Sequence, residues 1–213
     1  MTHFAILLGG DLTVTPRLAA QIDGARFIAA DSGMMHASAL GIVPELWVGD
    51  FDSSGSELTI QYRDVPRQSF SPEKDATDGA IAVAEALRRG ASRIVMLGGL
   101  GGQTDHTLGI LGQGLQLAKG GISCLMTSGH EEAYPLLPGQ MELDLAPDTR
   151  LSIIAFSDLT GLDIDNVKWP LQQRDVPLGS TLTLSNVAAG AVRIGLGSGY
   201  GIAIAYPPVA YND

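Results

Sequence analysis

The chain has 213 residues, of which 45% are hydrophobic, and its formal net charge at pH 7 is −10. This length allows one large domain or two small ones, each with its own core. The acidic balance argues against nucleic acid as a partner, because phosphate backbones are bound by clusters of Lys and Arg. It does not exclude a phosphate ligand bound through metal ions, which carboxylates would hold.

The start of the chain and its single cysteine, Cys124, indicate the compartment. The first residues lack the basic leader and the long apolar run of a signal peptide. No apolar stretch approaches the ~20 residues that a membrane helix needs. One cysteine cannot form a disulfide within the chain, which fits a reducing compartment. We therefore expect a soluble cytoplasmic protein with no membrane segment.

Strand-like and helix-like segments alternate over residues 1–130. The strand-like runs are apolar and end in Gly or Asp, whereas the helix-like segments have helical periodicity and end near Gly. This alternation predicts a mostly parallel, Rossmann-like α/β sheet with helices on both faces, which binds ligands beyond the carboxyl ends of its strands. The strands are expected over 4–8, 25–30, 46–48, 93–97 and 122–126, and the helices over 77–89 and 107–118.

The sequence changes character after about residue 130. Short alternating or β-branched runs replace the helical patterns, and Gly, Pro, Asp and Asn separate them. We expect a small all-β sandwich over 131–213, with the domain boundary within 130–140. Its strands are expected over 150–156, 180–184, 191–196 and 201–206.

Two carboxylates, Asp50 and Asp52, follow the third strand in the sequence Gly-Asp-Phe-Asp-Ser. Both can turn towards one cation once the backbone leaves the extended form. Mg²⁺ prefers oxygen ligands, usually one or two carboxylates with phosphates and water. An ordinary Asp/Ser turn explains the same residues, so the pattern alone leaves both interpretations open.

A second acidic pair, Asp75 and Asp78, lies at the start of the helix expected over 77–89. Residues three apart can share one side of a helix, and a nearby cation would relieve the repulsion between the two acids. Helix capping by Asp or Thr explains these residues equally well.

The loop 98–106 has four glycines in five residues, between an expected strand and an expected helix. Its backbone amides can approach phosphate oxygens. A flexible connection with Asp105 as a helix cap is the alternative. Asp31 also ends a strand, and it could instead cap a helix over 34–40. His3, His36 and His130 are expected to be exposed or structural, and no zinc pattern or serine-hydrolase motif is present.

Taken in order, these clusters resemble the thiamine pyrophosphokinase family. Each motif is weak alone, but together they cover nearly the whole chain at suitable spacing. The resemblance implies an α/β nucleotide-binding domain followed by a β-sandwich, and a homodimer that holds thiamine between subunits. The matching segments are 30–33, 49–53, 75–78, 98–106, 168–171 and 179–186.

The resemblance also implies an activity and a set of site residues. The expected reaction moves a diphosphate group from ATP to thiamine, giving thiamine diphosphate and AMP, with Mg²⁺ as cofactor. Mg²⁺ binding and catalysis would fall to Asp50, Asp52, Asp75 and Asp78. ATP would meet Asp31, Lys74, Gly99, Gly101, Gly102, Gln103, Asp105 and His106, and thiamine would meet Trp169, Ser185 and Asn186.

The chain departs from the family pattern at Gln103, where the family usually has Arg. Arg would neutralise phosphate charge and bind bidentately, whereas Gln103 hydrogen-bonds without charge. Lys74 or Arg67 could supply the missing charge. Met34 and Met35 replace the family's usual Ala-Asn, which would reshape the pocket wall.

Two other functions compete with this interpretation. Asp50-Phe51-Asp52 superficially matches the nucleophile motif of haloacid-dehalogenase-type phosphatases, although that motif normally follows the first strand. The substitution at Gln103 would also suit an inactive nucleotide- or vitamin-binding regulator.

Overall fold

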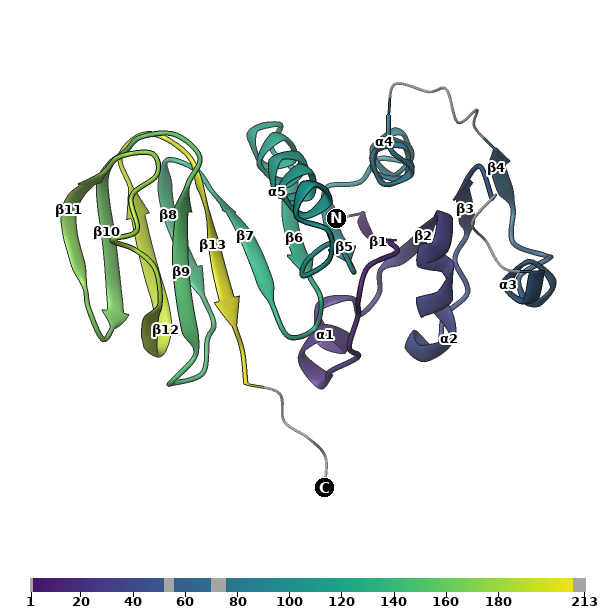
Figure 1. Cartoon of the computed structure of the whole chain (residues 1–213), viewed down its shortest axis with the longest axis horizontal. Coiled ribbons are helices and arrows are strands. Elements are labelled where there is room, and N and C mark those ends of the chain that lie inside the picture. Colours follow the sequence, from purple (N-terminus) through teal and green to yellow (C-terminus); the bar gives the residue numbers. More distant parts are fainter. Residues whose placement is uncertain (1, 52–55, 70–75, 209–213) are drawn as a thin grey trace.

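The computed structural model describes residues 2–51, 56–69 and 76–208, and it shows a mixed sheet with helices followed by a β-rich half (Figure 1). The N-terminal strands are parallel and follow the order β4–β3–β2–β1–β5–β6. From β1, the chain adds β2, β3 and β4 on one side and then β5 and β6 on the other. Their bounds are β1 (His3–Leu7), β2 (Arg26–Ala30), β3 (Leu46–Gly49), β4 (Arg67–Ser69), β5 (Arg93–Leu97) and β6 (Ser123–Thr127).

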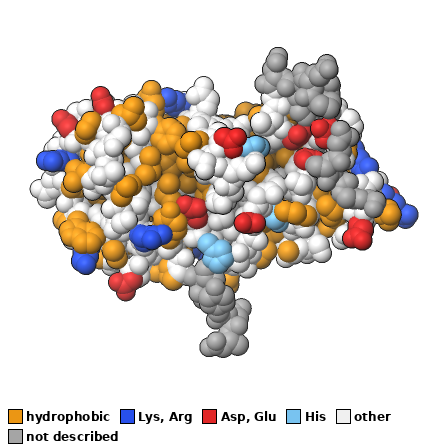
Figure 2. Space-filling model, in the orientation of Figure 1, with side chains coloured by type: hydrophobic (Ala, Val, Ile, Leu, Met, Phe, Trp, Pro, Cys, Tyr) orange, Lys and Arg blue, Asp and Glu red, His pale blue; other side chains and the backbone are white. Residues whose placement is uncertain are grey.

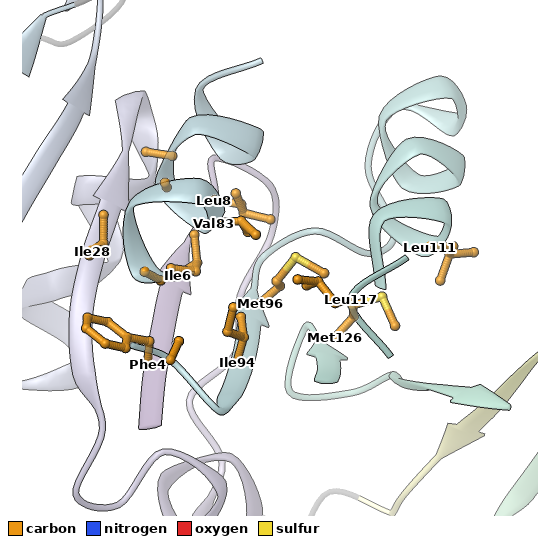
Figure 3. Packing of buried hydrophobic residues seen from close by; sticks show 14 of the residues in the cluster. Phe4, Ile6, Leu8, Ile28, Val83, Ile94, Met96, Leu111, Leu117 and Met126 are labelled. Carbon is orange, nitrogen blue, oxygen red and sulfur yellow. The ribbon is translucent and has the colours of Figure 1, made fainter. Parts of the chain in front are cut away.

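Helices cover both faces of this parallel layer, because its strands are apolar on both sides. Alternate residues of β1 separate the two cores: Ile6 packs with α4 and α5, whereas Leu7 packs with α1 and α2. Figure 3 shows Ile6, Met96 and Val83 in the first of these cores. The helical elements are α1 (Pro16–Gln21), a 3₁₀ turn η1 (Asp31–Met35), α2 (His36–Leu40), α3 (Ser56–Gln61), α4 (Asp78–Arg88) and α5 (Thr104–Lys119).

The C-terminal half consists of antiparallel strands with a core of their own. β7 pairs antiparallel with both β6 and β13, so the sheet continues from the parallel layer into the β-rich half. The strands are β7 (Glu132–Leu136), β8 (Gly139–Leu143), β9 (Arg150–Ala155), β10 (Leu159–Val167), β11 (Leu171–Val176), β12 (Asn186–Leu196) and β13 (Gly201–Tyr206).

The strands and helices expected in the N-terminal half are confirmed to within a few residues, and so is the last strand, 201–206. The strand expected over 180–184 is wrong. This segment forms local turns, in which Ser180 N–H donates to Pro177 and Leu184 N–H donates to Thr181. Its alternating pattern instead gives one anchor: Thr183 is buried, and its hydroxyl donates to the carbonyl of Ile153 at 2.6 Å.

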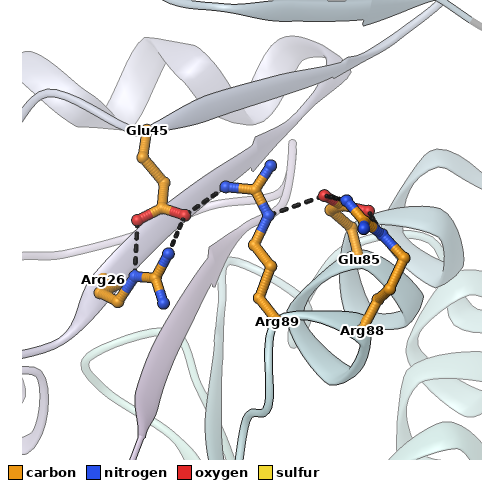
Figure 4. Close-up of polar contacts among 5 residues, drawn as sticks. All are labelled: Arg26, Glu45, Glu85, Arg88 and Arg89. Carbon is orange, nitrogen blue, oxygen red and sulfur yellow. Dashed lines mark hydrogen bonds and ion pairs between the residues drawn. The ribbon is translucent and has the colours of Figure 1, made fainter.

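An ion-pair network fixes the C-terminal end of α4 to the start of β2 and β3 (Figure 4). Glu45 accepts two hydrogen bonds of 2.7 Å from Arg26, and it also pairs with Arg89. Arg89 and Arg88 both donate to Glu85, which is 7% exposed. The hydrogen bonds from Arg88 lower the pKa of Glu85 to about 2 against the opposing effect of burial, so this carboxylate stays charged. The network fixes the helix whose other end carries Asp78.

The described helices include none that is both long and apolar enough to span a membrane.

Candidate active site

A cavity of about 670 Å³ lies at the carboxyl ends of β1, β2, β3 and β5. Two connections diverge at this point: the one after β1 leads to β2 on one side of the sheet, and the one after β5 leads to β6 on the other side. Such a divergence leaves a crevice, and open α/β sheets bind their ligands there. The lining comes from the strand-end loops and from the first turns of α4 and α5.

Glycines let three of these strand-end loops approach one another closely. A Cβ atom on Gly10 would lie 2.4 Å from the carbonyl oxygen of Gly98, and one on Gly9 would lie 2.2 Å from Ser32 Oγ. A Cβ on Gly33 would lie 2.2 Å from the carbonyl oxygen of Leu7. Side chains at these positions would push the loops apart, so the glycines set the shape of the cavity.

The unusual backbone conformation of Asp31 is stabilised by a hydrogen bond from a buried indole. Asp31 has a φ of 45°, which a non-glycine residue rarely adopts, and its carbonyl accepts a 2.8 Å hydrogen bond from Trp47 Nε1. Trp47 is fully buried, and Phe51 packs edge-on against it with ring centroids 5.1 Å apart. This packing fixes the chain on both sides of Asp50, which lines the cavity. The sequence pattern predicts Trp47 only as part of a strand.

The start of α4 brings a further carboxylate to the cavity. Thr77 caps the helix, since its hydroxyl accepts a 3.2 Å hydrogen bond from Ala80 N–H. Thr77 therefore does the capping, and Asp78 in the first turn lines the cavity. The N-terminal end of the helix dipole favours negative charge there.

Four carboxylates line the described part of the cavity, and no Lys or Arg does. They are Asp11, Asp31, Asp50 and Asp78; Asp11 was missed by sequence reasoning, although it follows the Gly9-Gly10 strand end just as Asp31 follows its own strand. Figure 2 shows acidic side chains and histidines across the middle of one face. Lys74, Asp52 and Asp75 lie outside the described residues. Within 2–51, 56–69 and 76–208, no three His, Cys, Asp or Glu side chains gather as a metal site.

Only some of the glycine-loop residues that are predicted to bind ATP line the cavity. Gly99, Gly102, Gln103 and His106 line the cavity, as does Gly98, but Gly101 and Asp105 are absent from the lining. The Asp105 carboxylate is exposed and accepts a 2.9 Å hydrogen bond from His106 N–H. Gln103 precedes α5 and makes no capping hydrogen bond with its side chain.

His36 contacts the loop after β1, which forms part of the cavity wall. It is 9% exposed, and its Nε2 lies 2.8 Å from the carbonyl oxygen of Gly10. Of the two expectations for His36, exposed or structural, its burial and this contact fit the second. Its contact joins α2 to the loop after β1, next to Asp11.

Two family descriptions match successive parts of the chain. The thiamin pyrophosphokinase catalytic domain matches residues 22–126, and the thiamin pyrophosphokinase vitamin B1 binding domain matches residues 140–200. The chain belongs to the thiamin pyrophosphokinase family. Its activity is that of the family, the transfer of a diphosphate group from ATP to thiamine.

Individual members of the thiamin pyrophosphokinase family resemble the chain over most of its length. A thiamine pyrophosphokinase of Bacillus subtilis is 30% identical over 197 residues, which are 87% of this chain and 89% of that protein. The crystal structure of a Bacillus subtilis thiamine pyrophosphokinase superposes with a TM-score of 0.87 at 25% identity, covering 98% of this chain and all of the other. A family protein of Enterococcus faecalis shares the fold, with a TM-score of 0.82 at 22% identity over 98% and 100% of the two chains.

The residues predicted to bind thiamine lie in the β-rich half, and none of them lines the cavity of its own chain. Trp169 lies between β10 and β11 and is 54% exposed. Asn186 is 8% exposed at the start of β12, and its side-chain amide bonds to the main chain of Trp169. Ser185 has a φ of 58°, and its N–H donates to Ser152 Oγ at 3.0 Å. Among the described residues, a single chain therefore does not bring the two predicted groups of site residues into one pocket.

Proposed function

We propose that the cavity at the ends of β1, β2, β3 and β5 holds the triphosphate of ATP and is where diphosphate transfer takes place. The observation that carries this proposal is the pairing of a glycine-rich strand-end crevice with four carboxylates and no described Lys or Arg. Backbone amides of the glycine loop and the start of α5 would bind phosphate oxygens. Carboxylates cannot do so directly, so they point to a cation between protein and phosphate.

Mg²⁺ fits this set of donors. Its usual protein sites offer one or two carboxylates, and phosphate and water supply the remaining oxygens. Among the described residues, Asp50 and Asp78 would hold it, and Asp52 and Asp75 are proposed as further ligands. Bound Mg²⁺ would offset the negative charge that develops on the phosphates.

The chain's own residues would then position the reactants, which is the main source of catalysis in phosphoryl transfer. The thiamine hydroxyl oxygen forms a bond to the β-phosphorus of ATP, the bond from that phosphorus to the bridging α,β-oxygen breaks, and AMP leaves. We assign Asp78 to orient the hydroxyl and accept its proton. Gln103 and His106 would hydrogen-bond the phosphates.

We further infer a division of the chain into a Rossmann-like ATP-binding domain, 1–130, and a β-sandwich, 131–213, that binds thiamine and forms a homodimer. The separate core of the β-rich half supports this division. The position of Trp169, Ser185 and Asn186 away from the cavity supports a second copy as the source of the thiamine-binding surface. A cytoplasmic location would suit an enzyme that consumes ATP.

The reaction can be tested by incubating the protein with ATP, MgCl₂ and thiamine and detecting thiamine diphosphate and AMP by mass spectrometry. We expect Asp50→Asn and Asp78→Asn to lower kcat by about 10²-fold or more, because each removes a charge that holds the metal or the nucleophile. Asp64→Asn is the matched control, since Asp64 is 94% exposed and pairs only loosely with Arg63 at 3.7 Å. Near-normal activity of both site variants would remove these aspartates from the mechanism.

The dimer proposal can be tested by mixing two inactive variants, Asp78→Asn and Trp169→Ala. If each site combines the cavity of one copy with Trp169 of another, mixed dimers contain one intact site and recover part of the activity. No recovery after verified subunit exchange would contradict a shared site.

A further inference from the structure

The side chain of Asn186 forms a two-point hydrogen bond with the main chain of Trp169. Trp169 N–H donates to Asn186 Oδ1 at 3.1 Å, and Asn186 Nδ2 donates to the Trp169 carbonyl at 2.8 Å. The amide thus pairs with one residue in the way that a neighbouring strand would. It fixes the main chain from which the exposed indole projects.

Most of the hydrogen-bonding capacity of Asn186 is used within the protein. Oδ1 accepts from Val187 N–H at 2.9 Å as well as from Trp169, which occupies both of its lone pairs. Nδ2 has one further N–H, and the residue is only 8% exposed. Asn186 therefore has little hydrogen-bonding capacity left for a ligand, in contrast to the direct contact that its sequence motif implies.

The segment around Trp169 needs such an anchor, because regular pairing is interrupted there. Trp169 and Pro170 lie between β10 and β11, and Pro170 has no N–H to donate. The proline also restricts Trp169 to extended conformations, which present its N–H and C=O for pairing. Lys168 N–H adds a 2.8 Å bond to the carbonyl of Val187, so two consecutive residues of the turn are tied to the start of β12.

One face of the Trp169 indole contacts a cation, and much of the ring remains exposed. The Lys168 ammonium lies 4.6 Å from the centroid of the Trp169 ring, and the side chain is still 54% exposed. A flat aromatic ring such as an aminopyrimidine can stack on exposed indole surface, and its fit depends on how firmly the indole is held.

We propose that Asn186 is a positioning residue: it acts on thiamine through Trp169, by holding the main chain of Trp169 so that the indole is presented in one orientation. This inference rests on the proposed function, in which Trp169 contacts thiamine. Loss of the amide pairing would leave the indole in place but loosely held, so that thiamine binding weakens while the ATP cavity is unaffected.

The test uses the full-length protein labelled with 5-fluorotryptophan. The chain has two tryptophans, and the Trp169→Phe variant assigns their ¹⁹F resonances. Asn186→Ala removes the whole pairing, whereas Asn186→Asp keeps the acceptor for Trp169 N–H and loses the donor to its carbonyl. Asn166→Gly is the matched control, because Asn166 also donates its amide to a main-chain carbonyl, that of Ala191 at 2.7 Å, and has a φ of 61° that glycine tolerates.

We expect Asn186→Ala to broaden or split the Trp169 resonance and to raise the KM for thiamine by about tenfold, with kcat and the KM for ATP within about twofold of the wild type. Asn186→Asp should fall between Asn186→Ala and the wild type, and the control should match the wild type. A sharp, unshifted Trp169 resonance or an unchanged thiamine KM in both Asn186 variants would overturn the positioning role. A wild-type protein that makes no thiamine diphosphate would instead refute the proposed function itself, so the two failures are distinguishable.

Discussion

Replacing Gly10 with alanine tests whether the close contact between strand-end loops sets the geometry of the proposed ATP cavity. The new Cβ would lie 2.4 Å from the carbonyl oxygen of Gly98, whereas ordinary contact begins near 3.4 Å, so one loop must move by about 1 Å. The obstacle is a main-chain atom, and the 3.0 Å hydrogen bond from Gly10 N–H to that same carbonyl has to distort with it. Overpacking of this kind costs about 1–3 kcal/mol of folding free energy.

The effect on activity should exceed the effect on stability. A 1 Å displacement of positioned groups can lower the rate about 10²-fold, so we expect Gly10→Ala to lower kcat/KM for ATP by about that factor while the protein remains folded at 25 °C. Gly109→Ala is the matched control: it lies in α5 outside the cavity lining, and its Cβ would meet nothing within 4 Å. Steady-state kinetics with thermal melts would decide. A Gly10→Ala enzyme with wild-type kcat/KM would refute the idea that this contact sets the cavity.

Two further substitutions address charge. Glu85→Gln should lower stability at pH 7 by about 1–2 kcal/mol: the fall in the pKa of Glu85 from 4.5 to about 2 corresponds to roughly 3 kcal/mol, and solvent around the 72% exposed Arg88 screens part of it. Because the folded-state pKa is lowered, this contribution is complete above about pH 4.5 and is lost as the pH falls towards 2. Urea melts at pH 7, 4 and 2.5 should therefore show the two proteins converging in acid, and a constant difference would contradict the assignment. Gln103→Arg should lower the KM for ATP by about three- to tenfold, because it adds a cation to a lining that has no described Lys or Arg; an unchanged or higher KM in kinetic assays would show that charge is already balanced there.

The strands of the parallel layer can be predicted from the sequence because they are buried on both faces. A run such as Phe4–Leu7 is continuously apolar and ends in glycine, which leaves few alternatives. Because the carboxyl ends of parallel strands share one edge, Asp31 and Asp50 are expected there, and both line one crevice. Asp78, expected at the start of a helix, lines the same crevice. Asp11 belongs to the same edge, but it lies past two glycines and was overlooked.

The strands of the β-rich half are harder to predict from the sequence, because pairing with neighbouring strands defines them more than their own hydrophobic pattern does. β10 and β11 pair through register shifts, and β11 has four exposed residues in succession, 172–175, which carry no alternating signal. The segment 180–184 has the opposite problem: it alternates like a strand, yet its backbone forms local turns, and Thr183 bonds to Ile153 of β9 without forming a strand. The role of Asn186 shows the same limit, since a motif identifies the residue but only the structure shows that its amide bonds to the main chain of Trp169.

Helix α4 connects an ion-pair network that stabilises the fold to the cavity. The network does not transmit changes of charge to the cavity. The C-terminal end of α4 is fixed by Glu85 and Arg89, and its N-terminal end carries Asp78 into the cavity. With a pKa of about 2, Glu85 does not change charge at any pH near neutrality, so this network cannot shift α4 in that range. Any change in activity around neutral pH therefore has a source other than this network. The network gives Asp78 a fixed position at the cavity, from which it could contact the proposed metal and the thiamine hydroxyl.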